Sequence, residues 1–194
     1  VIVPIGGGGL ASGVALALSS LSGSQGFRRQ GVRVVGAQVE GVDSMARAIR
    51  GDTTAIDPAR TLADGVRVKI PGFITRRLCA RLLDDVVIVR EAELRETLVR
   101  LALEENIIAE GAGALALAAG RRVAGKRKCA VVSGGNIDAA VLARLLSEVR
   151  PRPPRKPRRR TQELQPVEPS AAAPSTTPIA LDAPEARQPV TEEE

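Results

Sequence analysis

The stretch VIVPIGGGGLASGVALAL, residues 1–18, places four consecutive glycines between an apolar run and an apolar helical segment. A glycine in a regular element costs about 0.5–1 kcal/mol of stability relative to alanine, because its freer backbone loses more entropy on folding. Four in a row therefore require a reason, and we expect that reason to be a ligand. Backbone N–H groups at the start of a helix suit an anion, which the missing Cβ atoms allow to come close.

The rest of residues 1–150 alternates between short β-branched runs and helical patterns. Strands are predicted at residues 1–5, 33–40, 84–89 and 129–132, and helices at residues 10–21, 74–83, 91–106, 107–120 and 136–150. The segment 10–21 is apolar on every side, which predicts a buried helix. A loop region is predicted between the second strand and the second helix. The alternation predicts the α/β class, with a parallel sheet flanked by helices and a ligand at the carboxyl ends of its strands.

The composition changes sharply near Arg150. Ten of the 13 prolines lie in residues 151–194, which hold almost no branched apolar side chains. We therefore expect residues 1–150 to fold and residues 151–194 to form a disordered Pro/Arg-rich tail. The sequence pI near 10.3 is typical of nucleic-acid binding, but the basic residues of the body are scattered and the chain has no Trp or Tyr. Because no aromatic residues interleave with these basic residues for base stacking, a nucleic-acid partner is not expected.

Both cysteines, Cys79 and Cys129, lie in apolar segments without Cys-x-x-Cys spacing, and the chain has no histidine to complete a zinc site. We expect both to be reduced and buried. No apolar run reaches the roughly 18 residues that a membrane span needs, and no signal-peptide pattern is present. These features predict a cytoplasmic protein without membrane contact.

A second glycine motif, VVSGGNID at residues 131–138, also lies between a predicted strand and a predicted helix. Ser133 would lie at the strand end, with its hydroxyl free to hydrogen-bond a ligand ring. A purely structural interpretation stays open for both motifs. Glycine-rich turns can simply reverse the chain, and Ser133 or Asn136 could cap the last helix.

The residues after the four glycines narrow the identity of the phosphate ligand. A Walker nucleotide site is excluded, because no Gly-Lys-Ser or Gly-Lys-Thr is present. A dinucleotide fingerprint is formally present at Gly6, Gly8 and Ala11, with Glu40 as a candidate ribose ligand. That match is weak, because any tetraglycine generates it and Glu40 lies later than the roughly 20 residues expected.

Five motifs in a fixed order carry a resemblance: PIGGGGLASG, VEGVDSM, TLADGVRVK, IIAEGAGALALA and VVSGGNID. Together they resemble the second half of a serine/threonine dehydratase, in the threonine ammonia-lyase and serine racemase branch of the fold-type II pyridoxal-phosphate enzymes. The resemblance covers about residues 1–150 and implies an incomplete large domain of the tryptophan synthase β-like fold. It also implies pyridoxal 5'-phosphate as cofactor, a small amino-acid substrate and a homo-oligomer when full length.

The same resemblance implies roles for individual residues. The cofactor phosphate would be bound by Gly6, Gly7, Gly8 and Gly9, with Leu10 closing the loop. Ser133 would hydrogen-bond the pyridine nitrogen, and Gly65 would line the substrate side with its backbone. Glu110 would lie near the cofactor ring, with the alternative that it is a first-turn acid complementing a helix dipole.

Some members of this branch bind a divalent cation through a Glu, a backbone carbonyl and an Asp after the second strand. Glu40 matches the first ligand, but Ala46 stands where the Asp is expected. We therefore expect no metal site.

The Schiff-base lysine of the family lies upstream of its tetraglycine loop, and no lysine of this chain has the matching context. The lysines present are Lys69, Lys126, Lys128 and Lys156. We therefore expect a fragment of a longer enzyme that removes water and ammonia from L-threonine or L-serine and is inactive alone. The alternative is a catalytically inactive module that binds pyridoxal phosphate or a nucleotide, with a basic tail segment that binds an acidic partner. Threonine, serine and hydroxyaspartate remain open as substrates, as does racemase against lyase.

Overall fold

The computed structural model describes residues 1–20 and 32–148, so the predicted tail at 151–194 lies outside the described residues. Three parallel strands form one sheet, in the order β1 (Ile2–Pro4), β2 (Val35–Val39) and β3 (Asp85–Val89). Ile2 pairs with Val35, and Val35 pairs with Asp85. The prediction of an α/β fold built on a parallel sheet is confirmed.

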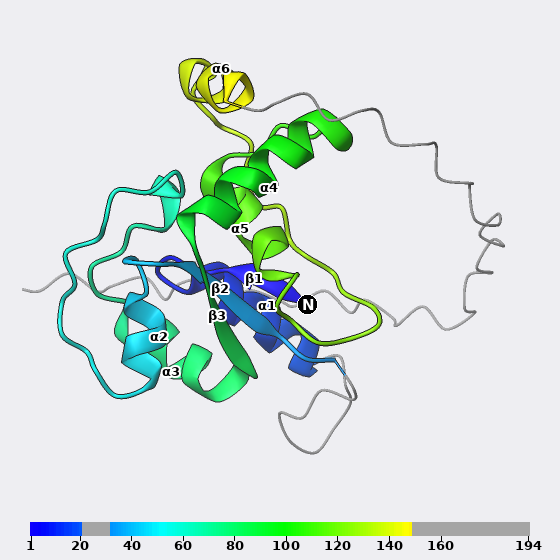
Figure 1. Ribbon diagram of the computed structural model, residues 1–194. Helices are drawn as coiled ribbons and strands as arrows, with labels where there is room; N and C mark the ends of the chain where they lie inside the picture. Colours follow the sequence, from blue (N-terminus) through cyan, green and yellow to red (C-terminus); the bar gives the residue numbers. More distant parts are fainter. Residues whose placement is uncertain (21–31, 149–194) are drawn as a thin grey trace, which may run out of the picture. The chain divides into compact units, whose positions relative to one another are not determined.

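Helices cover both faces of this sheet (Figure 1). On one face α1 (Gly9–Ser20) packs on β1, and α3 (Phe73–Leu82) packs on α1 and on α2 (Ser44–Ile49). On the other face α5 (Gly111–Ala119) packs on all three strands, α4 (Glu91–Glu104) packs on α5, and α6 (Ala139–Ser147) packs on α4. A 3₁₀ turn, η1 (Asp64–Val66), lies between α2 and α3 in the chain. None of the described helices is long and apolar enough to cross a membrane.

The two cores follow from the alternation of side chains along the strands. In β2, Val35, Ala37 and Val39 enter the core under α4 and α5. Gly36 faces the other side, where a Cβ atom would collide with Ile5 Cδ1. Strands β1 and β2 are thus buried on both faces, as expected for a parallel sheet, whereas β3 at the edge of the sheet is only partly buried.

Two predicted elements differ from the structure in extent. The strand predicted at 129–132 is reduced to a single parallel bridge between Ile2 and Ala130, with hydrogen bonds from the Ile2 amide to the Cys129 carbonyl and from the Val131 amide to the Ile2 carbonyl. Cys129 is exposed, so the prediction that it is buried is wrong, whereas Cys79 is buried as predicted. The helix predicted over 107–120 begins at Gly111, because the preceding backbone is extended and pairs with Gly134.

Helix α1 and the loop after β2 also differ from expectation. The prediction that α1 is buried on every side is wrong, because only one face of it packs on the sheet. Leu10 and Leu16 on the other face are 48% and 38% exposed in the described chain. The predicted loop region contains both α2 and η1, which are too short to leave a periodic pattern.

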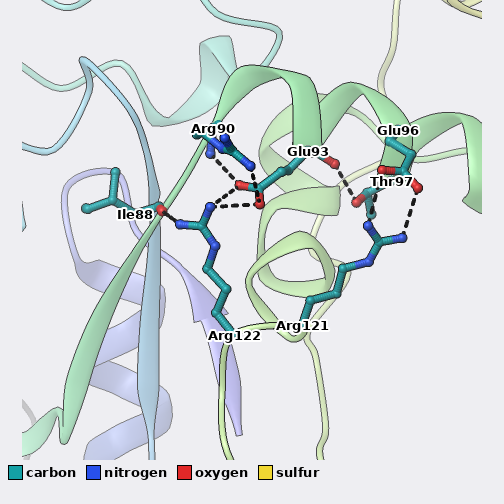
Figure 2. A network of polar contacts seen from close by, with 7 residues as sticks. All are labelled: Ile88, Arg90, Glu93, Glu96, Thr97, Arg121 and Arg122. Atoms are coloured by element: carbon teal, nitrogen blue, oxygen red, sulfur yellow. Dashed lines mark hydrogen bonds and ion pairs between the residues drawn. The ribbon is translucent and has the colours of Figure 1, made fainter.

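Helix α4 is fixed to its neighbours by two arginines that follow α5 (Figure 2). Arg122 donates to the Ile88 carbonyl in β3 at 2.7 Å and to both oxygens of Glu93 at 2.7 Å. Arg121 pairs with Glu96 one turn further along α4. The backbone N–H of Arg90 and the Arg122 guanidinium hold the pKa of Glu93 below its usual range.

Glu93→Gln should destabilise the intact protein that carries this chain by about 1–2 kcal/mol at pH 7, because hydrogen bonds to a carboxylate are lost. A carboxyl whose pKa is lowered by folding stabilises the fold above its unfolded pKa. That stabilisation is lost as pH falls through the folded pKa. Urea unfolding should be measured at several pH values. The difference in free energy of unfolding between wild type and Glu93→Gln should be largest above about pH 5 and should shrink below it.

Glu105→Gln is the matched control, because this exposed residue caps the other end of α4 and makes no side-chain hydrogen bond within the described residues. It should change the unfolding midpoint little at any pH. If the loss of stability in Glu93→Gln did not change with pH, the effect of the substitution would come from packing rather than from charge.

Candidate functional site

The tetraglycine loop joins β1 to α1 at the carboxyl end of β1. The amide of Ser12 donates to the Gly8 carbonyl at 2.9 Å and so forms the first turn of α1. Within the described ranges, the amides of Gly7 and Gly9 donate to no protein acceptor. The loop therefore offers free N–H groups at a helix N-terminus, where a phosphate binds well.

The fold explains two of the four glycines. A Cβ on Gly6 would lie 3.1 Å from Val66 Cα, and Gly8 has a φ of +90° with Met45 Cε 2.5 Å from a Cβ position. Gly7 and Gly9 have no described atom within 4 Å of a Cβ position and no left-handed φ. Neither the packing nor the backbone conformation of the described chain thus requires glycine at Gly7 and Gly9. The open space beside them would allow a ligand to come close.

Cys79 supports the loop from α3. Its Sγ donates to the Gly8 carbonyl at 3.8 Å, and it lies 3.2 Å from a Cβ position on Gly8. Burial raises the pKa of the Cys79 thiol to about 11, so the sulfur keeps the proton that it donates. Sequence analysis missed this contact because the two residues lie 71 positions apart and share no motif.

The structure brings three further predicted segments to the same place. A Cβ on Gly6 would lie 3.4 Å from the Gly65 carbonyl oxygen, and a Cβ on Gly65 would lie 3.9 Å from Glu110 Oε1. A Cβ on Gly134 would collide with the same Glu110 carboxylate. The tetraglycine, TLADG, AEGAGA and SGGN motifs therefore meet in one row.

Glu110 occupies the N-cap position of α5 and is half-buried. Its side chain makes no capping hydrogen bond, whereas its backbone N–H donates to the Gly134 carbonyl at 3.0 Å. The carboxylate instead lies against the backbones of Gly65 and Gly134. The contacts of Glu110 are thus with the other motifs rather than with its own helix.

Ser133 lies next to Gly134 and is exposed. The interpretation that Ser133 or Asn136 caps the last helix is wrong, because Asp138 accepts hydrogen bonds from the amides of Ala140 and Val141. In the described part of the chain, the Ser133 hydroxyl makes no hydrogen bond. It is therefore available to a ligand.

The remaining candidates lie apart from this row. Glu40 is exposed after β2, and Ala46 is buried in α2. Residues 1–20 and 32–148 contain no group of three Cys, Asp or Glu side chains that could hold a metal ion. The described lysines are exposed at Lys69, Lys126 and Lys128, while Lys156 lies outside the described residues.

Comparison with known proteins gives a consistent assignment. The family described as "Pyridoxal-phosphate dependent enzyme" matches residues 1–134. The chain is 38% identical over 152 residues to the L-threonine ammonia-lyase of Thermotoga maritima, covering 76% of this chain and 36% of that protein. It is also 38% identical over 152 residues to the catabolic L-threonine dehydratase of Escherichia coli K12, covering 75% of this chain and 44% of that protein. The chain thus spans less than half the length of these relatives.

Solved structures resemble the fold as well. A threonine deaminase from T.th. superposes with a TM-score of 0.61 and 33% identity, covering 71% of this chain and 49% of that one. Maize serine racemase superposes with a TM-score of 0.62 and 29% identity, covering 76% and 47%. This chain is therefore similar in both sequence and fold to the threonine deaminase and the serine racemase.

The two kinds of glycine should respond differently to substitution. Gly8→Ala should cost about 2 kcal/mol or more of stability, because alanine is strained at positive φ and its methyl group would meet Met45. Gly9→Ala should leave stability unchanged or raise it by up to about 1 kcal/mol, because alanine favours a helix and the space is open. Urea unfolding of the two variants measures the difference, and equal losses would contradict the distinction.

Proposed function

The chain belongs to the pyridoxal-phosphate dependent enzyme family, and we propose that the protein carrying it converts L-threonine or L-serine to the 2-oxo acid and ammonia. The β-hydroxyl would leave as water, and addition of one water to the resulting imine would release ammonia and the 2-oxo acid. The names of the two relatives and of the threonine deaminase structure support this reaction class. Because the chain spans under half of those relatives, the reaction is assigned to the intact protein.

One observation carries the proposal: four separated motifs meet beside glycines that the fold itself does not require. Gly7 and Gly9 leave open space at the helix N-terminus, and Gly65, Glu110 and Gly134 continue the row from Gly6. A phosphate at one end and an aromatic ring along the row would fit this arrangement. The residues present therefore fit pyridoxal phosphate.

In this proposal the loop holds the phosphate through backbone N–H groups. The amides of Gly7 and Gly9 are free in the described chain and add to the partial positive charge of α1. Leu10, the second residue of α1, would close the loop. This anchoring fixes one end of the cofactor without a charged side chain.

When bound, the cofactor supplies an electron sink for negative charge at the substrate Cα. Ser133 would hydrogen-bond the pyridine nitrogen, which a hydroxyl can do without forcing protonation as a carboxylate would. Glu110 would lie beside the ring, and the Gly65 backbone would border the substrate. We assign the amine that attaches the cofactor to sequence outside these 194 residues, because no lysine of this chain has the sequence context of the family's Schiff-base lysine.

The direct test is to assay the intact, cofactor-loaded protein with L-threonine, L-serine and 3-hydroxyaspartate for 2-oxo acid and ammonia, and for D-serine by chiral chromatography. We expect 2-oxo acid from threonine or serine. D-Serine without 2-oxo acid would make the protein a racemase. A protein that binds pyridoxal phosphate but transforms none of these amino acids would contradict the proposal and favour the inactive binding module.

Gly9→Ala should weaken pyridoxal-phosphate binding at least tenfold, or about 1.4 kcal/mol, because a methyl group enters the space assigned to the phosphate. Fluorescence titration of the apoprotein measures this affinity. Gly13→Ala is the matched control, since it lies one turn later in α1 and its Cβ position is also open. Equal affinities for both variants and wild type would overturn the assignment of the loop.

We also propose that the intact protein is a cytoplasmic homo-oligomer and that its pyridoxal-phosphate-binding part ends near residue 150.

A further inference from the structure

The loop that carries Gly65 is held by a carboxylate from α4. Thr61 Oγ1 donates to Glu91 Oε2 at 2.6 Å, and the Leu62 amide donates to Glu91 Oε1 at 2.8 Å. The Thr61 hydroxyl oxygen in turn accepts from the Ala63 amide at 3.0 Å. Each oxygen of Glu91 thus binds one of two successive residues, and all three bonds are partly buried.

Glu91 is available for this role because another acid of the same helical turn performs the capping. Glu93 accepts from the Arg90 amide at 2.9 Å and closes the N-terminus of α4. Arg122 ties Glu93 to β3, so the start of α4 is anchored to the sheet (Figure 2). The Glu91 carboxylate therefore extends from a fixed base.

The same loop also contacts α5. A Cβ on Gly111 would collide with the Leu62 carbonyl, so the two backbones are in direct contact. Immediately afterwards, the Val66 amide donates to the Ala63 carbonyl at 3.1 Å and closes the turn that contains Gly65. Any shift at Thr61 or Leu62 would therefore move Gly65 relative to Glu110.

We propose that Thr61 and Glu91 are positioning residues that set the place of Gly65 beside the amino-acid substrate. The inference rests on the proposed function, in which the Gly65 backbone borders the substrate. The phosphate loop contacts the same turn through Gly6, which lies against Val66, but Gly8 has separate support in Cys79 and Met45 on the other face of the sheet. The clamp formed by Thr61 and Glu91 should thus affect substrate use much more than phosphate binding.

Thr61→Val and Thr61→Ser form the decisive pair, studied in the intact, cofactor-loaded protein. Valine keeps the shape of threonine but removes both the donor to Glu91 and the acceptor for Ala63, whereas serine keeps both. We expect Thr61→Val to raise the KM for the amino acid or lower kcat/KM by about tenfold, as the loss of a hydrogen bond to a charged group would. Its dissociation constant for pyridoxal phosphate should stay within about twofold of wild type. Thr61→Ser should restore wild-type kinetics.

Hydrogen exchange supplies a readout that does not depend on turnover. In Thr61→Val, the amides of residues 62–66 should exchange at least several-fold faster than in wild type and in Thr61→Ser. Glu91→Gln should behave like Thr61→Val, because the amide cannot accept from both partners. Glu105→Gln, at the far end of α4, should match wild type.

The outcomes separate the clamp from the reaction itself. If wild type is active and Thr61→Val matches it in kcat, KM and exchange, the clamp is overturned while the proposed function stands. If exchange rises but kinetics do not, Thr61 and Glu91 only stabilise the loop, and the positioning role is overturned. If wild type binds pyridoxal phosphate but turns over none of the amino acids, the proposed function fails, and exchange still reports whether the clamp holds the loop.

Discussion

Backbone segments meet at this site more closely than Cβ atoms would allow, and the rest of the site depends on that approach. Gly113 lies against the Gly134 backbone, Gly111 against the Leu62 carbonyl, and Gly6 against Val66. Each contact joins two segments that are distant in the chain. Because peptide groups rather than side chains form the walls, the site offers hydrogen-bonding groups at fixed positions, and a substitution of one glycine would separate a pair of segments.

The local elements could be predicted from sequence because their signals are local. The β-branched runs at 35–39 and 85–89 and the acids in the first turn of α4 lie within a few residues of the structure that they produce. The apolar run at 129–132 predicted a fourth strand, but only Ala130 is bridged to β1, because strand pairing depends on a distant partner that the local run does not specify. Cys129 is exposed beside this bridge.

The site was predictable in its motifs but not in its supports. The tetraglycine, Gly65, Glu110 and Ser133 each stand in a recognisable sequence pattern. The contacts of Cys79 with Gly8 and of Thr61 with Glu91 join residues 71 and 30 positions apart, and nothing in either local sequence signals the partner. Supports of this kind are properties of the packed fold. A polar residue in a loop and an acid in a helix remain ambiguous until the fold places them together.

The groups that the described chain brings to the site are suited to binding and orientation rather than to proton transfer at the substrate. They are free amides, the hydroxyl of Ser133, the backbone of Gly65 and the single carboxylate of Glu110. Amides and a hydroxyl hold a phosphate and a ring without changing their own charge at neutral pH. In the proposed assignment, the described chain would set where the cofactor and the substrate lie, and a displacement of its loops would act first on the geometry in which the substrate is held. For the same reason, affinity and exchange measurements report on this part of the protein more directly than turnover does.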